Sequence, residues 1–239
     1  MDILNEKVAL ITGGTKGIGY SVALAMMDQG MKVAITGRSK EGVDKALESL
    51  KMDGAHNCIG IVCDVRNYES QQACADKVIE AYGKLDVLIA NAGVGHFASI
   101  EELTPDQWQE VIDVNLTGVF YSTKACLDSL KESSGYIITI ASLAGTNFFA
   151  RGSAYNASKF GLVGFSQAVM LDLRHSGVKV STIMPGSVAT YFNDHVPSDA
   201  DAWKIQPEDI GQIVIDLLKM NPRTLPSKIE VRPSVPPKK

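Results

Sequence analysis

The stretch "ALITGGTKGIGYSVALAMM", residues 9–27, decides the fold because it contains a strand, a turn and a helix in direct succession. The apolar residues at 7–12 are typical of a buried strand, and residues 17–29 follow a helical pattern. Four glycines lie between residues 13 and 19, where the chain must turn tightly. The first N–H groups and the positive dipole end of such a helix attract an anion. The stretch therefore predicts a phosphate-binding strand–turn–helix unit, with a purely structural glycine turn as the alternative.

The same alternation of short apolar runs and longer helical patterns continues along the chain. The expected strands span residues 7–12, 32–36, 58–63, 85–90, 136–141, 179–184 and 228–232. The expected helices lie near residues 17–29, 40–51, 68–82, 106–131, 155–175 and 207–219. Strands that are nearly continuous in apolar residues and alternate with helices are typical of a parallel sheet covered on both faces. The pattern predicts an α/β fold, a doubly wound seven-stranded parallel sheet with helices on both faces.

Domain organisation and composition narrow the class of protein. No break in composition precedes the proline-bearing tail at 233–239, so a single domain over 1–239 is expected. A net charge of −4 without a basic patch argues against a nucleic-acid surface. Neither a signal peptide nor an apolar run of about 18 residues is present in the sequence, so we expect a cytoplasmic protein without membrane contact. The cysteines and histidines show no ligand spacing, so no metal is expected.

The residues after the second expected strand indicate which nucleotide the glycine turn binds. An acidic residue at this position would mark NAD, but the sequence reads "ITGRSK" over residues 35–40. Arg38 offers a guanidinium that can hold a 2′-phosphate in bidentate fashion, and Lys16 adds a positive charge nearby. A solvated loop arginine is the alternative interpretation. The sequence favours NADP(H).

A second stretch, "SAYNASKFGLVGFSQAV" at 153–169, places Tyr155 and Lys159 one helical turn apart at the start of an apolar helix. A helix that is apolar almost all round is buried, and a lysine is rarely buried without a partner. The pair can be a core tyrosine beside a lysine that extends to water. It can also be a phenol whose acidity a neighbouring ammonium increases.

Six short motifs in order decide between these interpretations. They are "TGGTKGIG" at 12–19, "NAG" at 91–93, Asn115, Ser142 in "ITIASLAG", "YNASK" at 155–159 and "PGSVAT" at 185–190. The chain resembles the short-chain dehydrogenase/reductase family in its compact form, and the resemblance covers essentially the whole chain. Within the family it is similar to 3-oxoacyl-[acyl-carrier-protein] reductases and carbonyl reductases. The resemblance implies a Rossmann-type domain that binds NADP(H).

The resemblance implies a catalytic tetrad of Asn115, Ser142, Tyr155 and Lys159. Tyr155 would donate a proton to the carbonyl oxygen, and Ser142 would hold that oxygen. Lys159 would lower the phenol pKa and hydrogen-bond the nicotinamide ribose. A decrease of about 3 pKa units would require about 4 kcal/mol. Asn115 would anchor a water that relays protons to Lys159.

The cofactor-binding residues that the resemblance implies extend along the whole chain. Asp64 would contact the adenine through its side chain and Val65 through its backbone. Residues 91–93 would line the adenosine ribose, and residues 185–190 would hold the nicotinamide carboxamide. The complete expected set is Gly13, Thr15, Lys16, Gly17, Ile18, Gly19, Arg38, Ser39, Asp64, Val65, Asn91, Ala92, Gly93, Tyr155, Lys159, Pro185, Gly186, Val188 and Thr190.

The substrate is less determined than the cofactor. We expect a substrate-loop segment at about 191–206, in which Tyr191, Phe192 and Trp203 could form an apolar wall. In the loop after "NAG", His96 and Phe97 can point into the site or pack on the surface. Candidates for a basic rim that would dock an acidic carrier protein are Arg151 and Lys204.

The expected activity is reversible carbonyl–alcohol interconversion with NADP(H), on a 3-oxoacyl thioester or a related small-molecule ketone. A hydroxysteroid, sugar or pteridine reductase with the same tetrad is an alternative. A non-catalytic NADP-sensing protein is an alternative of a different class. By analogy with the family, the apolar helices at 106–131 and 155–175 would pack against copies of themselves. The expected assembly is a homo-oligomer, a tetramer with a dimer as the other possibility.

Overall fold

The structure is a computed structural model that describes residues 3–54 and 57–237. Among these residues, parallel strands form one seven-stranded sheet in the order β3-β2-β1-β4-β5-β6-β7. The strands are β1 (Val8–Ile11), β2 (Lys32–Gly37), β3 (Cys58–Val62), β4 (Val87–Ala90), β5 (Tyr136–Ile140), β6 (Lys179–Pro185) and β7 (Lys228–Val231). The doubly wound parallel fold expected from the sequence is confirmed.

The strand order reverses at the centre of the sheet, where β1 lies between β2 and β4. Open α/β sheets bind ligands beyond the carboxyl ends of their strands at such a reversal. Every residue of β1, β4 and β5 is buried, because helices cover both faces of these central strands. The edge strand β7 alternates between exposed and half-buried residues. The sequence therefore places its most apolar strands beside the expected ligand crevice.

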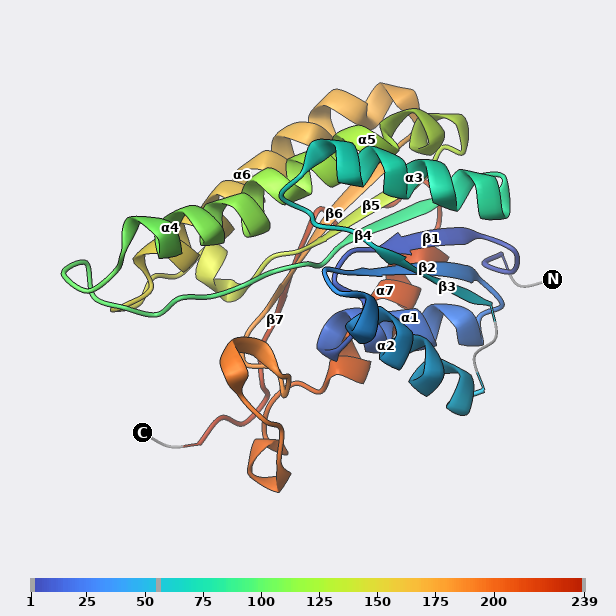
Figure 1. Cartoon of the computed structure of the whole chain (residues 1–239). Helices are drawn as coiled ribbons and strands as arrows, with labels where there is room; N and C mark the ends of the chain where they lie inside the picture. Colours follow the sequence, from blue (N-terminus) through green and yellow to red (C-terminus); the bar gives the residue numbers. More distant parts are fainter. Residues whose placement is uncertain (1–2, 55–56, 238–239) are drawn as a thin grey trace.

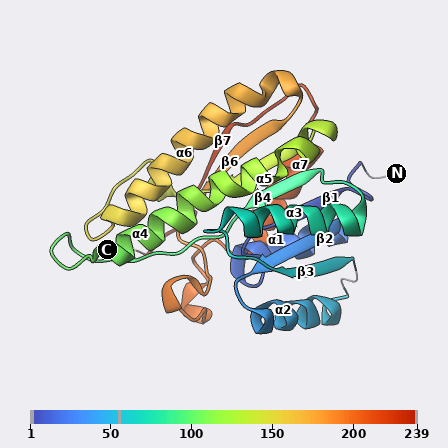
Figure 2. The ribbon, with the colours of Figure 1, turned by 45° about the horizontal axis from the view of Figure 1, so that its top comes forward.

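Helices cover the two faces of the sheet (Figure 1). Their bounds are α1 (Gly17–Asp28), α2 (Lys40–Met52), α3 (Tyr68–Tyr82), α4 (Pro105–Ile112), α5 (Gly118–Glu132), α6 (Ser153–Leu173) and α7 (Pro207–Lys219). One face carries α1, α2 and α7, and the other carries α3, α5 and α6, with α4 extending beyond the sheet (Figures 1 and 2). Two buried clusters fill the spaces between the sheet and these layers.

The helix expected over residues 106–131 is interrupted in the structure. α4 ends at Ile112, a π-helical turn spans Asp113–Thr117, and α5 begins at Gly118. A π turn inserts an extra residue into the helix and often marks a functional position. Here it contains Asn115, which is completely buried. The other expected helices and strands differ from the observed ones only at their ends.

The segment after β6 forms two short 3-10 turns at Phe192–Asp194 and Asp199–Asp201. It lies near the C-terminal end of the described chain (Figure 1). Residues 238 and 239 of the expected tail fall outside the described residues. Among the described helices, none is both long and apolar enough to cross a membrane.

Candidate active site

A cavity of about 1170 Å³ opens at the carboxyl ends of the central strands. It is lined by residues that follow β1, β2, β4, β5 and β6, and by residues of α6. Pockets for single small ligands usually measure about 300–1,000 Å³. The cavity is therefore large enough for a dinucleotide together with a substrate.

Most of the site residues expected from the sequence line this one cavity. They are Gly13, Thr15, Lys16, Gly17, Ile18, Arg38, Ser39, Val65, Asn91, Ala92, Gly93, Ser142, Tyr155, Lys159, Pro185, Gly186, Val188 and Thr190. Three expected residues, Gly19, Asp64 and Asn115, are not among the described residues that line it. The fold thus brings together motifs that lie far apart in the sequence.

The glycine turn has the geometry of an anion cradle. Gly13 and Gly17 adopt positive φ angles of 64° and 58°, which favour glycine. A Cβ atom on Gly19 would lie 2.6 Å from the side-chain nitrogen of Asn91, so Gly19 lets the turn pack against the loop after β4. Among the described residues, no side chain caps the N-terminus of α1. Its first N–H groups, beside the cavity, are therefore suited to the pyrophosphate of a dinucleotide.

Arg38 lines the cavity at the end of β2, and its side chain is 58% exposed. Its guanidinium lies 3.6 Å from a carboxylate oxygen of Glu110. The other Glu110 oxygen lies 2.8 Å from Nε2 of His96. Hydrogen bonding to His96, and also the charge of Arg38, lower the pKa of Glu110. His96 is not among the described residues that line the cavity. Of the two orientations left open by the sequence, it has the one outside the site, packed against Glu110 of α4.

Asp64 forms an ion pair with Arg66, two residues further along the chain. Its carboxylate accepts hydrogen bonds from the Arg66 guanidinium, the shortest at 2.6 Å, and from the Arg66 backbone N–H. These hydrogen bonds lower the pKa of Asp64. Val65, the next residue, lines the cavity instead. The side-chain contact with adenine that the resemblance implies for Asp64 would have to compete with this ion pair.

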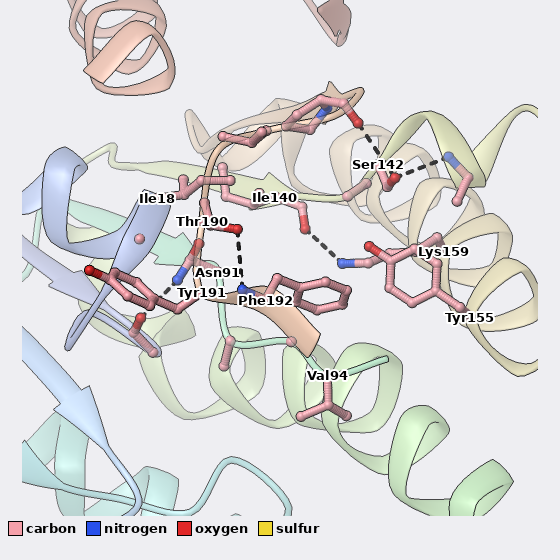
Figure 3. A pocket seen from close by; sticks show the side chains of 18 of the residues that line it. Ile18, Asn91, Val94, Ile140, Ser142, Tyr155, Lys159, Thr190, Tyr191 and Phe192 are labelled. Carbon is pink, nitrogen blue, oxygen red and sulfur yellow. Dashed lines mark hydrogen bonds between the residues drawn. The ribbon is translucent and has the colours of Figure 1, made fainter. Parts of the chain in front are cut away.

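Tyr155 and Lys159 lie on the first turns of α6, and both line the cavity (Figure 3). The Lys159 amino group donates to the carbonyl oxygen of Ile140 at 3.0 Å and lies 5.7 Å from the Tyr155 ring centroid. Ser142 lies just after β5. Its hydroxyl accepts a hydrogen bond from the Ala144 N–H at 3.1 Å and donates one to the Pro185 carbonyl at 3.4 Å. Phenol, ammonium and hydroxyl groups therefore meet at one end of the cavity.

Burial controls the protonation of this pair. It raises the pKa of Tyr155 to about 12, against a smaller opposite effect of the hydrogen bond with Ser142. Burial also lowers the pKa of Lys159 to about 8. The expected decrease in the Tyr155 pKa is therefore not found in the chain by itself. Surroundings of low polarity disfavour the phenolate and the ammonium alike.

Asn115 connects the π turn to two other parts of the site. Its side chain accepts from the Val94 N–H at 2.8 Å, donates to the Val94 carbonyl at 2.9 Å and donates to the Ser158 hydroxyl at 3.0 Å. Ser158 precedes Lys159 on α6. Asn115 therefore fixes the loop after β4 against the helix that carries the lysine.

Aromatic side chains surround Tyr155 at the substrate end of the cavity. Phe97, Phe149 and Phe192 all line it, as do the expected wall residues Tyr191 and Trp203. In Figure 3 the Phe192 ring lies on the Tyr155 side of its loop. For Phe97 the structure decides between the two orientations left open by the sequence, and the ring points into the site. Sequence reasoning missed Phe149, whose only signal was its position just before the "YNASK" motif.

The substrate-loop segment is held together by one buried carboxylate, Asp201. One of its oxygens lies 2.7 Å from Nε2 of His195 and accepts from the Ser198 N–H, and the other lies 2.5 Å from the Lys204 amino group. The Lys204 and His195 hydrogen bonds are the main causes of its lowered pKa. Lys204, a candidate for a basic rim, is thus neutralised within the segment, and Arg151 is paired with Glu102 at 3.1 Å.

Asp201→Asn is expected to loosen the segment at neutral pH. The pKa of Asp201 is lower in the folded protein than in the unfolded chain. Ionised Asp201 therefore stabilises the fold at pH values above its pKa in the unfolded chain, and this stabilisation is lost as the pH falls through its pKa in the folded protein. Backbone amides in residues 191–206 should exchange hydrogen at least about tenfold faster in the variant. Asp199→Asn, an exposed position in the same turn, is the matched control. Equal protection in both variants would contradict the assignment.

Comparison with known proteins agrees with the fold. Residues 7–201 match the short chain dehydrogenase family. A provisionally named ketoacyl reductase of Streptomyces coelicolor is 36% identical over 86% of this chain and 80% of its own. An uncharacterised oxidoreductase of Staphylococcus aureus is 32% identical over 98% of this chain and all of its own.

Solved structures give the same result. An alcohol dehydrogenase of the archaeon Thermococcus sibiricus, complexed with 5-hydroxy-NADP, has a TM-score of 0.90 and 30% identity over 98% of this chain and 99% of its own. A variant of the actinorhodin polyketide ketoreductase with NADPH has a TM-score of 0.87 and 31% identity over 98% of both chains. The family match covers most of the sequence, and the relatives span nearly its whole length. The chain therefore belongs to the short-chain dehydrogenase family and is an oxidoreductase.

Proposed function

We propose that the chain is an NADP(H)-dependent ketone reductase, with 3-oxoacyl thioesters among the first ketones to test. One observation carries this proposal: Tyr155, Lys159 and Ser142 line the same cavity as the glycine turn and Arg38. A proton donor and a dinucleotide cradle are thus within reach of one substrate. The ketoacyl reductase and polyketide ketoreductase among the relatives support the substrate class.

The residues of the cavity fit a nicotinamide dinucleotide. The uncapped N-terminus of α1 would hold the pyrophosphate, and Pro185 and Gly186, which line the cavity, would hold the carboxamide end. When bound, the reduced cofactor supplies the hydride that the carbonyl carbon accepts.

The chain itself supplies the proton and the positioning. With a pKa of about 12 the Tyr155 hydroxyl is protonated at neutral pH, and the Lys159 ammonium would promote the transfer of its proton to the carbonyl oxygen. The Ser142 hydroxyl would hydrogen-bond the same oxygen as negative charge develops on it. The Lys159 ammonium would stabilise the phenolate left behind, and Asn115 would hold the water that returns a proton to Lys159. Little solvent reaches the Lys159 ammonium, since this side chain is only 4% exposed.

Arg38 is proposed to select NADPH over NADH by holding the 2′-phosphate, with Lys16 and Ser39 beside it. Arg38→Gln is expected to raise the KM for NADPH about 10- to 100-fold, because hydrogen bonds to a charged group contribute about 1.5–3 kcal/mol. The KM for NADH should change less than about threefold, since NADH carries no such phosphate. The measurement is steady-state oxidation of both cofactors by each variant.

Lys40→Gln is the control for that experiment, because Lys40 is exposed, is paired with Asp44 and is not among the described lining residues. It should leave both KM values unchanged. An equal change for NADPH and NADH in Arg38→Gln would remove the basis for the assigned preference.

The proposed activity is tested by NADPH and NADH oxidation against 3-oxoacyl thioesters, diketones, aldehydes, steroids and sugars. Turnover of a ketone with NADPH supports the proposal. Turnover only of steroids or sugars would favour the alternative reductases. Tight NADPH binding without turnover on any carbonyl compound would favour an NADP-sensing protein.

The assembly is proposed to be a homotetramer in the cytoplasm, with a dimer as the other possibility. Large apolar side chains are exposed on α4, α5 and α6, among them Trp108, Phe120, Phe160 and Leu171. Exposed apolar surface of this kind is typical of a protein interface. Sedimentation at working concentration tests the proposal, and a monomer would contradict it.

A further inference from the structure

Four aromatic rings from four different segments converge at the reactive end of the cavity. The Phe97 ring lies 5.4 Å from Tyr155, 5.9 Å from Phe149 and 6.3 Å from Phe192, measured between centroids. The Tyr155 and Phe192 rings are 5.7 Å apart. All four separations fall within the about 4.5–7 Å typical of favourable edge and offset ring contacts. We name Phe97, Phe149 and Phe192 the aromatic wall.

The backbone leaves room for the aromatic wall at two glycines. A Cβ atom on Gly95 would lie 2.8 Å from the Phe192 ring and 3.1 Å from the Phe97 ring. A Cβ atom on Gly152 would lie 2.5 Å from the Phe149 ring. Any larger residue at either position would displace a ring of the aromatic wall. Glycine at positions 95 and 152 therefore allows the three rings to occupy their observed positions.

The wall is incompletely covered by the protein. Phe149 is 48% exposed although it lines the cavity and touches Phe97. The neighbouring lining residue Tyr191 is 49% exposed. Apolar rings that face a cavity without being covered are suited to a ligand that brings apolar surface of its own.

Charges around this end of the cavity do not favour an anionic carrier. Arg151 is paired with Glu102 and Lys204 with Asp201. Arg232, which lines the cavity from the C-terminal side, is paired with Glu230 at 2.9 Å. The acidic side chains of a carrier protein that delivers a linear acyl chain would have to displace these carboxylates from Arg151, Lys204 and Arg232. An uncharged ring needs no such exchange.

We propose that the aromatic wall binds an aromatic or alicyclic ring next to the carbonyl group, and that it makes this chain prefer uncharged ring ketones to linear 3-oxoacyl thioesters. The inference rests on the proposed function, since it names the substrate class of the same site. Phe97 is its central specificity residue because its ring contacts Tyr155 and both other members of the wall.

The test compares three ketones with NADPH: 1-phenyl-1,2-propanedione, 2,3-hexanedione and acetoacetyl-N-acetylcysteamine. The wild type should show at least about tenfold higher kcat/KM for the phenyl diketone than for the other two, because ring contacts add to the burial of apolar area. Phe149→Ala and Phe97→Leu should each lose about three- to tenfold of that preference, mainly through KM. Equal kcat/KM for the three ketones in the wild type would overturn the proposal.

Phe148→Ala is the matched control, because Phe148 adjoins Phe149, is 86% exposed and is not among the described lining residues. It should retain the full preference for the phenyl diketone. A similar loss in Phe148→Ala and Phe149→Ala would attribute the effect to the loop rather than to the wall.

A binding measurement separates this inference from the proposed function. Calorimetric titration of 1-phenyl-1,2-propanedione into Tyr155→Phe with NADP⁺ reports on the wall without turnover, since the variant keeps the ring at position 155. Weaker binding after adding Phe149→Ala, but not after adding Phe148→Ala, supports the wall even if no ketone is reduced. Unchanged binding in both double variants contradicts it, whatever the activity. Absence of turnover on every ketone would refute the reductase function alone.

Discussion

Tyr155→Phe is expected to lower kcat/KM for ketone reduction about 10²- to 10⁴-fold, the contribution usual for a positioned proton donor. The variant removes one oxygen atom from a side chain whose hydroxyl hydrogen-bonds Ser142. The Tyr155 ring also contacts Phe97 and Phe192, and phenylalanine preserves these contacts. NADPH affinity should therefore change less than about tenfold, since losing one hydrogen bond costs about 0.5–1.5 kcal/mol. The measurements are steady-state kinetics and fluorescence titration with NADPH.

Tyr20→Phe is the control, because the Tyr20 hydroxyl bonds Asp53 and Tyr20 is not among the described residues that line the cavity. It should retain full activity. If Tyr155→Phe still reduces ketones at the wild-type rate, another group must donate the proton and the proposed mechanism is wrong.

Lys159→Met is expected to abolish most activity and yet make the protein more stable at neutral pH. The buried Lys159 has a pKa of about 8, below its unfolded value near 10.4. Keeping it charged in the fold costs about 3 kcal/mol below pH 8, and losing its hydrogen bond to Ile140 offsets about 1 kcal/mol of the gain. The variant should therefore be more stable than the wild type by about 2 kcal/mol at pH 7. Residues at functional sites often lower stability in this way.

The pH dependence of this difference has a definite sign. Between the folded and unfolded pKa values, the unfolded wild type binds more protons, so its stability rises with pH relative to the variant. The advantage of Lys159→Met should shrink by about 2 kcal/mol between pH 7 and pH 10. Urea unfolding of both proteins at the two pH values measures it. A difference that does not change with pH would show that Lys159 is not charged and buried in the fold.

Lys179→Met is the matched control for the loss of activity. The Lys179 amino group also lies 5.7 Å from a tyrosine ring centroid, that of Tyr136, but Lys179 is not among the described lining residues. The variant should keep its activity. Loss of activity in Lys179→Met would indicate that removing any lysine beside a tyrosine perturbs the fold.

Local sequence patterns were sufficient to predict most of the fold. Each strand could be predicted because an apolar run and the turn residues that bound it lie within a few residues of one another in the sequence. The glycine turn at 13–19 is such a case, since its strand, turn and helix are contiguous. The spacing of Tyr155 and Lys159 is another, because one helical turn fixes which side chains share a face. The ion pair between Asp64 and Arg66 is equally local, two residues apart, but the family resemblance does not indicate it.

What depends on remote contacts could not be predicted. The π turn at Asn115 rotates the apolar stripe by about 100°, but it spans only Asp113–Thr117, which is too short a stretch for periodicity to locate it. Its place follows from bonds to Val94 and Ser158, which come from two other segments. Glu110 reaches Arg38 only because α4 and the end of β2 lie together in the fold.

The sequence by itself thus determined the parallel sheet, the position of the dinucleotide cradle and the identity of the tyrosine–lysine pair, because each is encoded within one or two adjacent elements. Only the tertiary structure decided the protonation of that pair and the surroundings of its substrate. Burial, which depends on every packed neighbour, sets the pKa values of Tyr155 and Lys159. The aromatic wall has the same origin, since its rings meet only when three loops end at one edge of the sheet.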